Sequence, residues 1–166
     1  MAAEASIAIG VSASAITFAS FAARCIKAIK AIHEACGELP SGIRRSQQLT
    51  DDFSRLLKRL ESRIEQPESA QIFHNTVSDF RHAIDDGTKA VKELLRILES
   101  IEPSDQEATR PKWTSKVKAG LRLARKETKI KAILQTLEQA RDHINLLISE
   151  RTFDCSIDHH QVSSVF

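Results

Sequence analysis

The chain has 166 residues, which is enough for one domain with a buried core. Its 42% hydrophobic and 28% charged residues are ordinary for a globular protein, and a net charge of +2 gives no overall argument for nucleic-acid binding. With five Gly, four Pro, no Tyr and no period-two alternation of useful length, the sequence favours helices and excludes a mainly β fold.

The first predicted helix covers about residues 3 to 36, where Gly37 and Pro40 end it. Apolar and small residues recur at spacings of three and four, which places them on one helical face. That face comprises Ile7, Val11, Ser14, Phe18, Phe21, Cys25, Ala28, Ile32 and Ala35. A second helix is predicted over about residues 43 to 64, before Pro67. Its apolar face comprises Leu49, Phe53, Leu56, Leu60 and Ile64.

The third predicted helix has the most regular apolar pattern in the chain. Its stripe comprises Phe73, Val77, Phe80, Ile84, Gly87, Val91, Leu94, Leu98 and Ile101. A stripe of this length is typical of a helix packed inside a bundle. Gly87 lies within it and indicates either a close approach of another helix or a kink, and a break at Gly87 would divide this segment into two helices.

The fourth segment runs from Lys112 to about Glu150 and contains two apolar stripes that are out of phase. The first comprises Trp113, Val117, Leu121 and Ala124, and the second comprises Ile130, Leu134, Leu137, Ile144 and Leu147. We therefore expect a short helix, then a kink or tight turn near residues 126 to 128, and then a long last helix. Residues 152 to 166 have no helical period and are predicted to be a loose tail or the start of a linker. The predicted fold is an all-α bundle of four to five long helices over residues 1 to 151.

The stretch from Ala5 to Ala23 carries no charge and has the length of a short membrane span or of a signal-peptide core. The charge nearest to its start is Glu4, whereas a signal peptide begins with basic residues. Ser, Thr and Gly residues also dilute its apolar character. We therefore expect neither a signal peptide nor a constitutive transmembrane helix.

Motifs for nucleotide, metal and nucleophilic chemistry are missing from the sequence. The five glycines never cluster into a phosphate-binding loop, and Asp85-Asp86-Gly87 lacks the alternating oxygen ligands of a calcium loop. The three cysteines lack the spacing of a zinc site or a disulfide framework, which favours reduced thiols in a cytosolic protein. The six histidines are scattered. We predict no catalytic, cofactor-binding or metal site and no small-molecule substrate.

The uncharged stretch is the first of two features that suggest a function. Its apolar residues lie on more than one side of the predicted helix, and those predicted to insert into a membrane are Ile7, Ile9, Val11, Ile16, Phe18 and Phe21. Small residues at spacing four, Gly10 with Ser14 and Ala15 with Ala19, permit close helix contact in a membrane. A central helix buried by its neighbours has the same pattern. The two interpretations are compatible if a helix that is buried at rest is later released.

The second feature is a basic run from Arg110 to Lys131, in which nine cations accompany a single acid, Glu127. One interpretation is contact with anionic lipid head groups through Lys112, Lys116, Lys118, Arg122, Arg125, Lys126 and Lys129. A solvated helix face explains the run equally well. Nucleic acid is disfavoured because no aromatic residue beyond Trp113 is interleaved with the cations.

Three stretches, covering about residues 1 to 150 together, carry a family resemblance. They are a small-residue hydrophobic opening, MAAEASIAIGVSASAITFASFAARCIKAI, a second helix with a short loop before it, ELPSGIRRSQQLTDDFSRLLKRLE, and a Trp-led basic segment with a final amphipathic helix, KWTSKVKAGLRLARKETKIKAILQTLEQARDHINLLIS. In this order they resemble the HeLo-like N-terminal domains of fungal NLR-type (STAND) receptors. Those domains are helical bundles related in outline to the four-helix domain of mixed lineage kinase domain-like protein.

The resemblance implies a cell-death or incompatibility effector that is cytoplasmic at rest and acts at the plasma membrane. Self-association driven by a receptor NTPase module, in cis or in trans, would bring the N-terminal helix to anionic membrane lipids and permeabilise the membrane. The alternative is a helical adaptor or oligomerisation module that recruits a protein partner and never contacts lipid.

Overall fold

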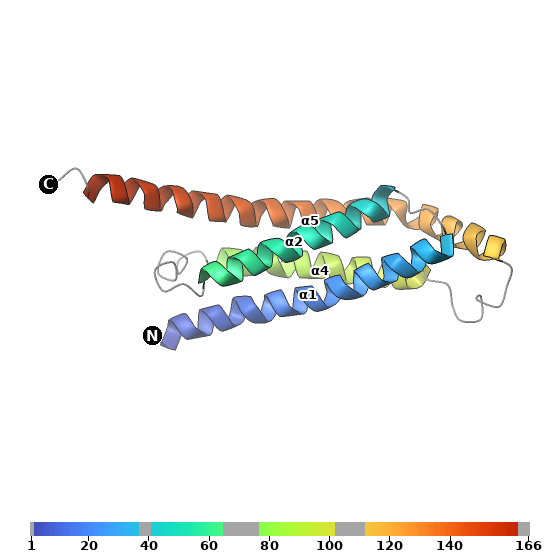
Figure 1. Ribbon diagram of the computed structural model, residues 1–166, viewed down its shortest axis with the longest axis horizontal. Helices are drawn as coiled ribbons and strands as arrows, with labels where there is room; N and C mark the ends of the chain where they lie inside the picture. Colours follow the sequence, from blue (N-terminus) through green and yellow to red (C-terminus); the bar gives the residue numbers. More distant parts are fainter. Residues whose placement is uncertain (1, 37–40, 65–76, 102–111, 163–166) are drawn as a thin grey trace.

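The chain folds into an all-α bundle in a computed structural model (Figure 1). The structure describes residues 2–36, 41–64, 77–101 and 112–162, and it describes side chains in 13–34, 41–62, 78–101, 117–118 and 120–150. Within these ranges there are four helices and no strand. The helices are α1 (Ala2–Cys36), α2 (Ser41–Ile64), α4 (Val77–Ile101) and α5 (Lys112–Val162). The predicted fold class is therefore confirmed.

The four helices run along one long axis, α1 and α4 in one direction and α2 and α5 in the other (Figure 1). α4 packs against both α1 and α5, and α2 packs against the same two helices from the other side. α1 and α5 share fewer contacts, so they lie diagonally across the core. The ends of the described helices follow the sequence, because Gly37, Pro67, Pro103 and Pro111 each come within three residues of such an end along the chain.

The core lies along the predicted apolar faces. Each described apolar member of the α4 stripe is almost fully buried, namely Phe80, Ile84, Val91, Leu94, Leu98 and Ile101. The side chains of Phe73 and Val77 lie outside the described residues. α4 continues through Gly87 without a break, so the possible division into two helices is wrong. The buried hydroxyls of Ser46 and Thr50 donate to backbone carbonyls three or four residues earlier in α2.

α5 is one continuous helix of 51 residues, so the tight turn, one of the two expectations for residues 126 to 128, is absent. The two apolar stripes are indeed out of phase, but the backbone does not bend back to bury both. Instead, the first stripe faces solvent: Val117 and Leu121 are 58% and 53% exposed, and Ala124 is exposed as well. Leu123 is buried in their place.

The end of α5 also differs from the prediction. The helix continues to Val162, beyond the expected end near residue 151. Residues 152 to 162 contain neither Gly nor Pro, so no residue there stops a helix, even though no apolar face repeats along it. Residues 163–166 lie outside the described part.

Candidate functional site

One side of α1 packs into the core, as its apolar face predicts. The buried residues of that side are Ala15, Phe18, Ala22, Cys25, Ala28, Ile29 and Ile32. Phe21 is partly buried and packs against the edge of the core. The described charge-free part of the helix therefore packs on the bundle through small residues, the buried ring of Phe18 and the partly buried ring of Phe21.

The six residues predicted to enter a membrane have different environments. The side chains of Ile7, Ile9 and Val11 lie outside the described residues. Among the other three, Phe18 is fully buried, Phe21 is half-buried, and Ile16 is 67% exposed on the outer side of α1. Insertion of all six would therefore require α1 to leave its position in the bundle.

Phe18 lies where three helices meet. Its ring stacks on Phe53 of α2, with a centroid distance of 4.5 Å and an interplanar angle of 26°. Phe53 in turn lies against Gly87 of α4, where an added Cβ would be only 2.5 Å from the Phe53 Cζ atom. Residue 87 must therefore be Gly for the ring to occupy this position. Gly87 therefore makes room for a ring of α2 rather than for the backbone of another helix, and this ring connects α1, α2 and α4.

Polar contacts join α1 to α4 around this apolar contact. Arg24 Nη2 donates to Glu99 Oε1 at 2.6 Å, and both side chains are about half exposed. Such a solvent-screened ion pair contributes at most about 1 kcal/mol. Lys92 Nζ lies 5.8 Å from the centroid of the Phe21 ring, a cation–π distance. Apolar burial, rather than charge, accounts for most of what holds α1 in place.

Cys25 is a fully buried thiol of α1 that donates to the backbone carbonyl of Val91 across a 3.5 Å contact. Burial and, to a lesser degree, the nearby Glu99 carboxylate raise the pKa of this thiol to about 12, against the opposing effect of Arg24. The thiol is therefore protonated at neutral pH, and a protonated thiol is not a nucleophile. Cys25 is a packing residue.

The outer face of α1 is uncharged over its described first half. Ile16 is surrounded there by exposed small residues, namely Ala13, Thr17, Ala19, Ser20 and Ala23. The Thr17 hydroxyl donates to the carbonyl of Ala13 at 2.8 Å, so this polar group is satisfied within the helix. The exposed faces of α2 and α4, in contrast, carry charged side chains. No helix within the described ranges combines the length and the apolar character needed to cross a membrane.

The basic run lies on the first half of α5. Of the seven residues predicted to contact head groups, Lys112 and Lys116 have side chains outside the described part. The other five lie at the surface, exposed or half-buried: Lys118, Arg122, Arg125, Lys126 and Lys129. The one acid of the run, Glu127, pairs with Lys131 at 2.9 Å. Within the run itself, cations outnumber acids by nine to one.

The two predicted parts of the site are not brought together. α1 begins at one end of the long axis, and α5 begins at the other end (Figure 1). A helix of 35 residues such as α1 spans about 52 Å at 1.5 Å per residue. Because α1 and α5 also lie diagonally, residues 5 to 23 and the basic run form two separate surfaces.

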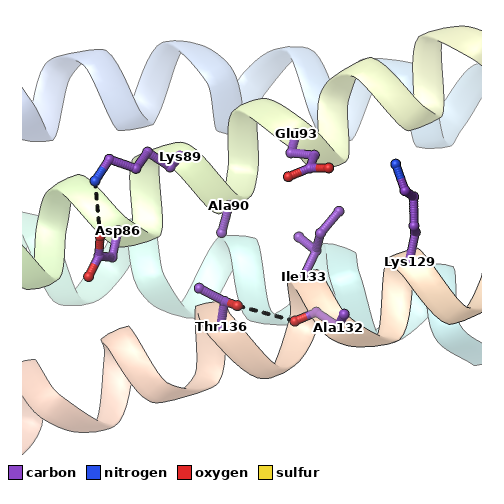
Figure 2. Close-up of a pocket in the computed structure, with 8 residues that line it drawn as sticks. All are labelled: Asp86, Lys89, Ala90, Glu93, Lys129, Ala132, Ile133 and Thr136. Atoms are coloured by element: carbon purple, nitrogen blue, oxygen red, sulfur yellow. Dashed lines mark hydrogen bonds and ion pairs between the residues drawn. The ribbon is translucent and has the colours of Figure 1, made fainter.

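A groove of about 390 Å³ lies between α4 and α5 (Figure 2). Its base is formed by Ala90 and Ile133, and charged side chains of both signs border it, with Lys89 paired to Asp86 at 3.2 Å. The Thr136 hydroxyl at one side donates to the carbonyl of Ala132 at 3.2 Å. The residues that line this groove include no Cys or His that could serve as nucleophile or base.

Metal chemistry has no visible site in the described part of the chain, where no three His, Cys, Asp or Glu side chains are grouped to hold an ion. Asp85-Asp86-Gly87 lies inside α4 rather than in a loop, so its oxygens do not converge as those of a calcium loop do. Comparisons with protein-family models, curated proteins and solved structures found no match. The fold defines the chain only as a helical bundle.

Sequence reasoning missed the ion pairs that join helices. Arg24 and Glu99 are 75 residues apart, and Arg45 and Glu138 are 93 residues apart. No local spacing predicts such a pair, because the partners become neighbours only when the helices pack. The exposure of Val117 and Leu121 was also missed, although the phase difference within α5 was a signal for it.

Proposed function

We propose that this bundle is a membrane-active cell-death effector domain of the HeLo-like type, whose α1 inserts into the plasma membrane after self-association. The observation that carries the proposal is the uncharged outer face of α1 around Ile16 in the closed bundle. Together with the buried side, it makes residues 5 to 23 free of charge all round. Such a helix moves into lipid without carrying an ionised group into hydrocarbon, which would be costly.

The domain is cytoplasmic at rest, with α1 packed on α2 and α4. Clustering by a receptor NTPase module, in cis or in trans, supplies the neighbours that α1 needs after release. Small residues at spacing four, such as Ala15 and Ala19, then allow copies of α1 to pack closely in the membrane. Burial of Phe18 in lipid regains about 1.5–3 kcal/mol of the apolar burial lost on release. The basic run of α5 contacts anionic head groups.

The test is dye release from anionic liposomes by the full chain and by an Ile16→Glu variant. Ile16 is the suitable position because its exposure allows a charge without damage to the core, whereas Glu at the fully buried Phe18 would unfold the bundle. A carboxylate near the middle of an inserted helix costs about 2.5–3.5 kcal/mol. We therefore expect leakage to fall by about tenfold or more.

The matched control is Leu146→Glu, because Leu146 of α5 is 56% exposed and lies outside both predicted surfaces. It should leak like the unchanged protein, and circular dichroism should show full helix content in both variants. Unreduced leakage by folded Ile16→Glu would refute insertion of α1. If the unchanged protein neither binds nor permeabilises liposomes but forms a stable complex with itself or a protein partner, the adaptor function is correct instead.

A further inference from the structure

Exposed large apolar side chains are few in the described part of this bundle, and two of them are adjacent. Val117 and Leu121, more than half exposed, lie one turn apart on α5, and Ala124 continues the same line. Ile16 of α1 and Leu146 near the other end of α5 each lie elsewhere. We call the line of Val117, Leu121 and Ala124 the α5 ridge.

A row of cations runs beside the α5 ridge. The row comprises Lys118, Arg122, Arg125 and Lys129. The first three come directly after the three residues of the ridge, and Lys129 comes directly after Thr128. One residue corresponds to a rotation of about 100°, so the row lies on the adjacent flank of the helix for about 16 Å. Leu123 and Ile130 are buried on the opposite side. α5 therefore points an apolar line away from the core, with positive charge along one edge.

We propose that the α5 ridge and its cation row form a docking surface through which the closed bundle binds an anionic membrane surface. The apolar side chains enter the boundary between head groups and acyl chains, and the long cationic side chains reach the phosphates beside them. This arrangement is that of an amphipathic helix lying in the membrane interface. The proposal rests on the proposed function for its target, but it does not require α1 to insert.

Charge selects the membrane over a second copy of the chain as the occupant. A symmetric contact between two antiparallel α5 ridges would bring the identical cation rows to the same edge, where like charges repel, and a parallel contact would offer neither row a surface with an excess of negative charge. An anionic bilayer offers negative charge at its surface and hydrocarbon just below, so it is complementary to both parts of the ridge. The one acid in this half of α5, Glu127, is already paired with Lys131.

The position of α5 makes docking a separate step from insertion. The α5 ridge points away from the core, and α1 lies diagonally across that core. A membrane bound at the ridge therefore contacts the bundle without disturbing Phe18 or its stack on Phe53. Docking brings closed bundles together on one surface, where clustering and release of α1 follow.

The experiment is flotation of the full chain with vesicles of phosphatidylcholine containing phosphatidylserine, and with vesicles of phosphatidylcholine alone. We expect binding to the former only. Val117→Ser with Leu121→Ser should weaken that binding by about tenfold or more, because two large side chains lose their apolar burial. Leu146→Ser, the same change at an equally exposed position of α5, should bind normally. Arg125→Gln with Lys129→Gln should weaken binding and reduce its salt dependence.

Fluorescence of Trp113, the single Trp of the chain, gives a second readout. It lies four residues before Val117, and a blue shift on adding anionic vesicles is expected for the unchanged protein and not for the ridge variant. Normal vesicle binding by the ridge variant would overturn the proposal. The proposal would also be overturned if the ridge variant lost a complex with a protein partner while its binding to vesicles was unchanged.

Failure of the docking proposal is distinguishable from failure of the proposed function. An Ile16→Glu protein that binds vesicles but does not leak supports both docking at α5 and insertion of α1. A protein that leaks normally with the ridge changed overturns docking alone. Full leakage by Ile16→Glu combined with loss of binding by the ridge variant overturns insertion alone.

Discussion

The first halves of α1 and α5 differ in how their apolar residues are used. In α1, which is uncharged from residue 5 to residue 23, the predicted stripe faces the core and includes the fully buried Phe18. In α5, a stripe with the same spacing faces solvent at Val117 and Leu121, beside a row of cations. The same spacing of apolar residues therefore faces the core in α1 and solvent in α5.

The reason for the difference lies in the rest of each helix. The stripe of α1 keeps its phase as far as Ile32, so one orientation buries Phe18, Cys25, Ala28 and Ile32 and partly buries Phe21. The long second stripe of α5, from Ile130 to Leu147, fixes the rotation of the whole helix, and the shorter first stripe must follow because no Gly or Pro between them relaxes the backbone. A period identifies a face, but the longest stripe on a rigid helix determines which face is buried.

The largest expected effect comes from truncating one residue of each stripe. Phe18→Ala removes a fully buried ring and its stack on Phe53, and it should lower the free energy of unfolding by about 4 kcal/mol. Leu121→Ala removes a side chain that is 53% exposed and should change that free energy by less than about 0.5 kcal/mol. Urea denaturation followed by circular dichroism measures both. A loss at Leu121 similar to the loss at Phe18 would mean that the ridge is buried.

Much of the fold was predictable from the sequence. The faces of α1, α2 and α4 were correct because each helix has one stripe, and because Gly and Pro mark the boundaries. The continuity of α5 was not predictable. Two apolar stripes that are out of phase give the same sequence pattern whether the chain turns between them or one stripe is left in solvent. The helix beyond residue 151 was missed because a helix can extend without an apolar period when no residue interrupts it.

The candidate site was less predictable than the fold. The uncharged stretch and the basic run were visible in the sequence as composition. Their separation to opposite ends of the bundle depends on the packing of helices that are distant in the sequence (Figure 1). The division of α1 into a buried Phe18 and an exposed Ile16, only two residues apart, likewise requires the orientation of the helix in the bundle.

Replacing each of two glycines by Ala should change the stability of the bundle by an intermediate amount, with opposite signs at the two positions. Gly87→Ala gains about 1 kcal/mol of helix propensity, but its Cβ would meet the Phe53 ring, and overpacking of this kind costs about 1–3 kcal/mol. We expect a net loss of about 1–2 kcal/mol, together with weaker retention of α1. Gly120→Ala on α5 meets no atom within 4 Å and should stabilise the helix by about 0.5–1 kcal/mol. Thermal unfolding compares the two, and equal signs would contradict the difference in packing.

The smallest effect concerns the thiol of Cys25 beneath α1. Burial raises the pKa of this thiol from 9.0 to about 12. Between those values the unfolded chain releases the proton while the folded bundle keeps it, so the stability present below pH 9.0 decreases as the pH rises. The loss should be about 1 kcal/mol over the first pH unit above that point. Urea denaturation across this range measures it.

Cys25→Ala is the control for this titration, because it removes the thiol and leaves every other titratable group in place. The variant should be less stable at every pH, owing to the lost packing, but its stability should fall less steeply above pH 9.0. If the free energy of unfolding fell equally with pH in the two proteins, water would reach Cys25 in the folded state. That result would mean that α1 already separates from α4 near Val91. A steeper fall of the free energy of unfolding in the unchanged protein would show that the inner side of α1 is inaccessible to water, in contrast to the solvent-exposed α5 ridge.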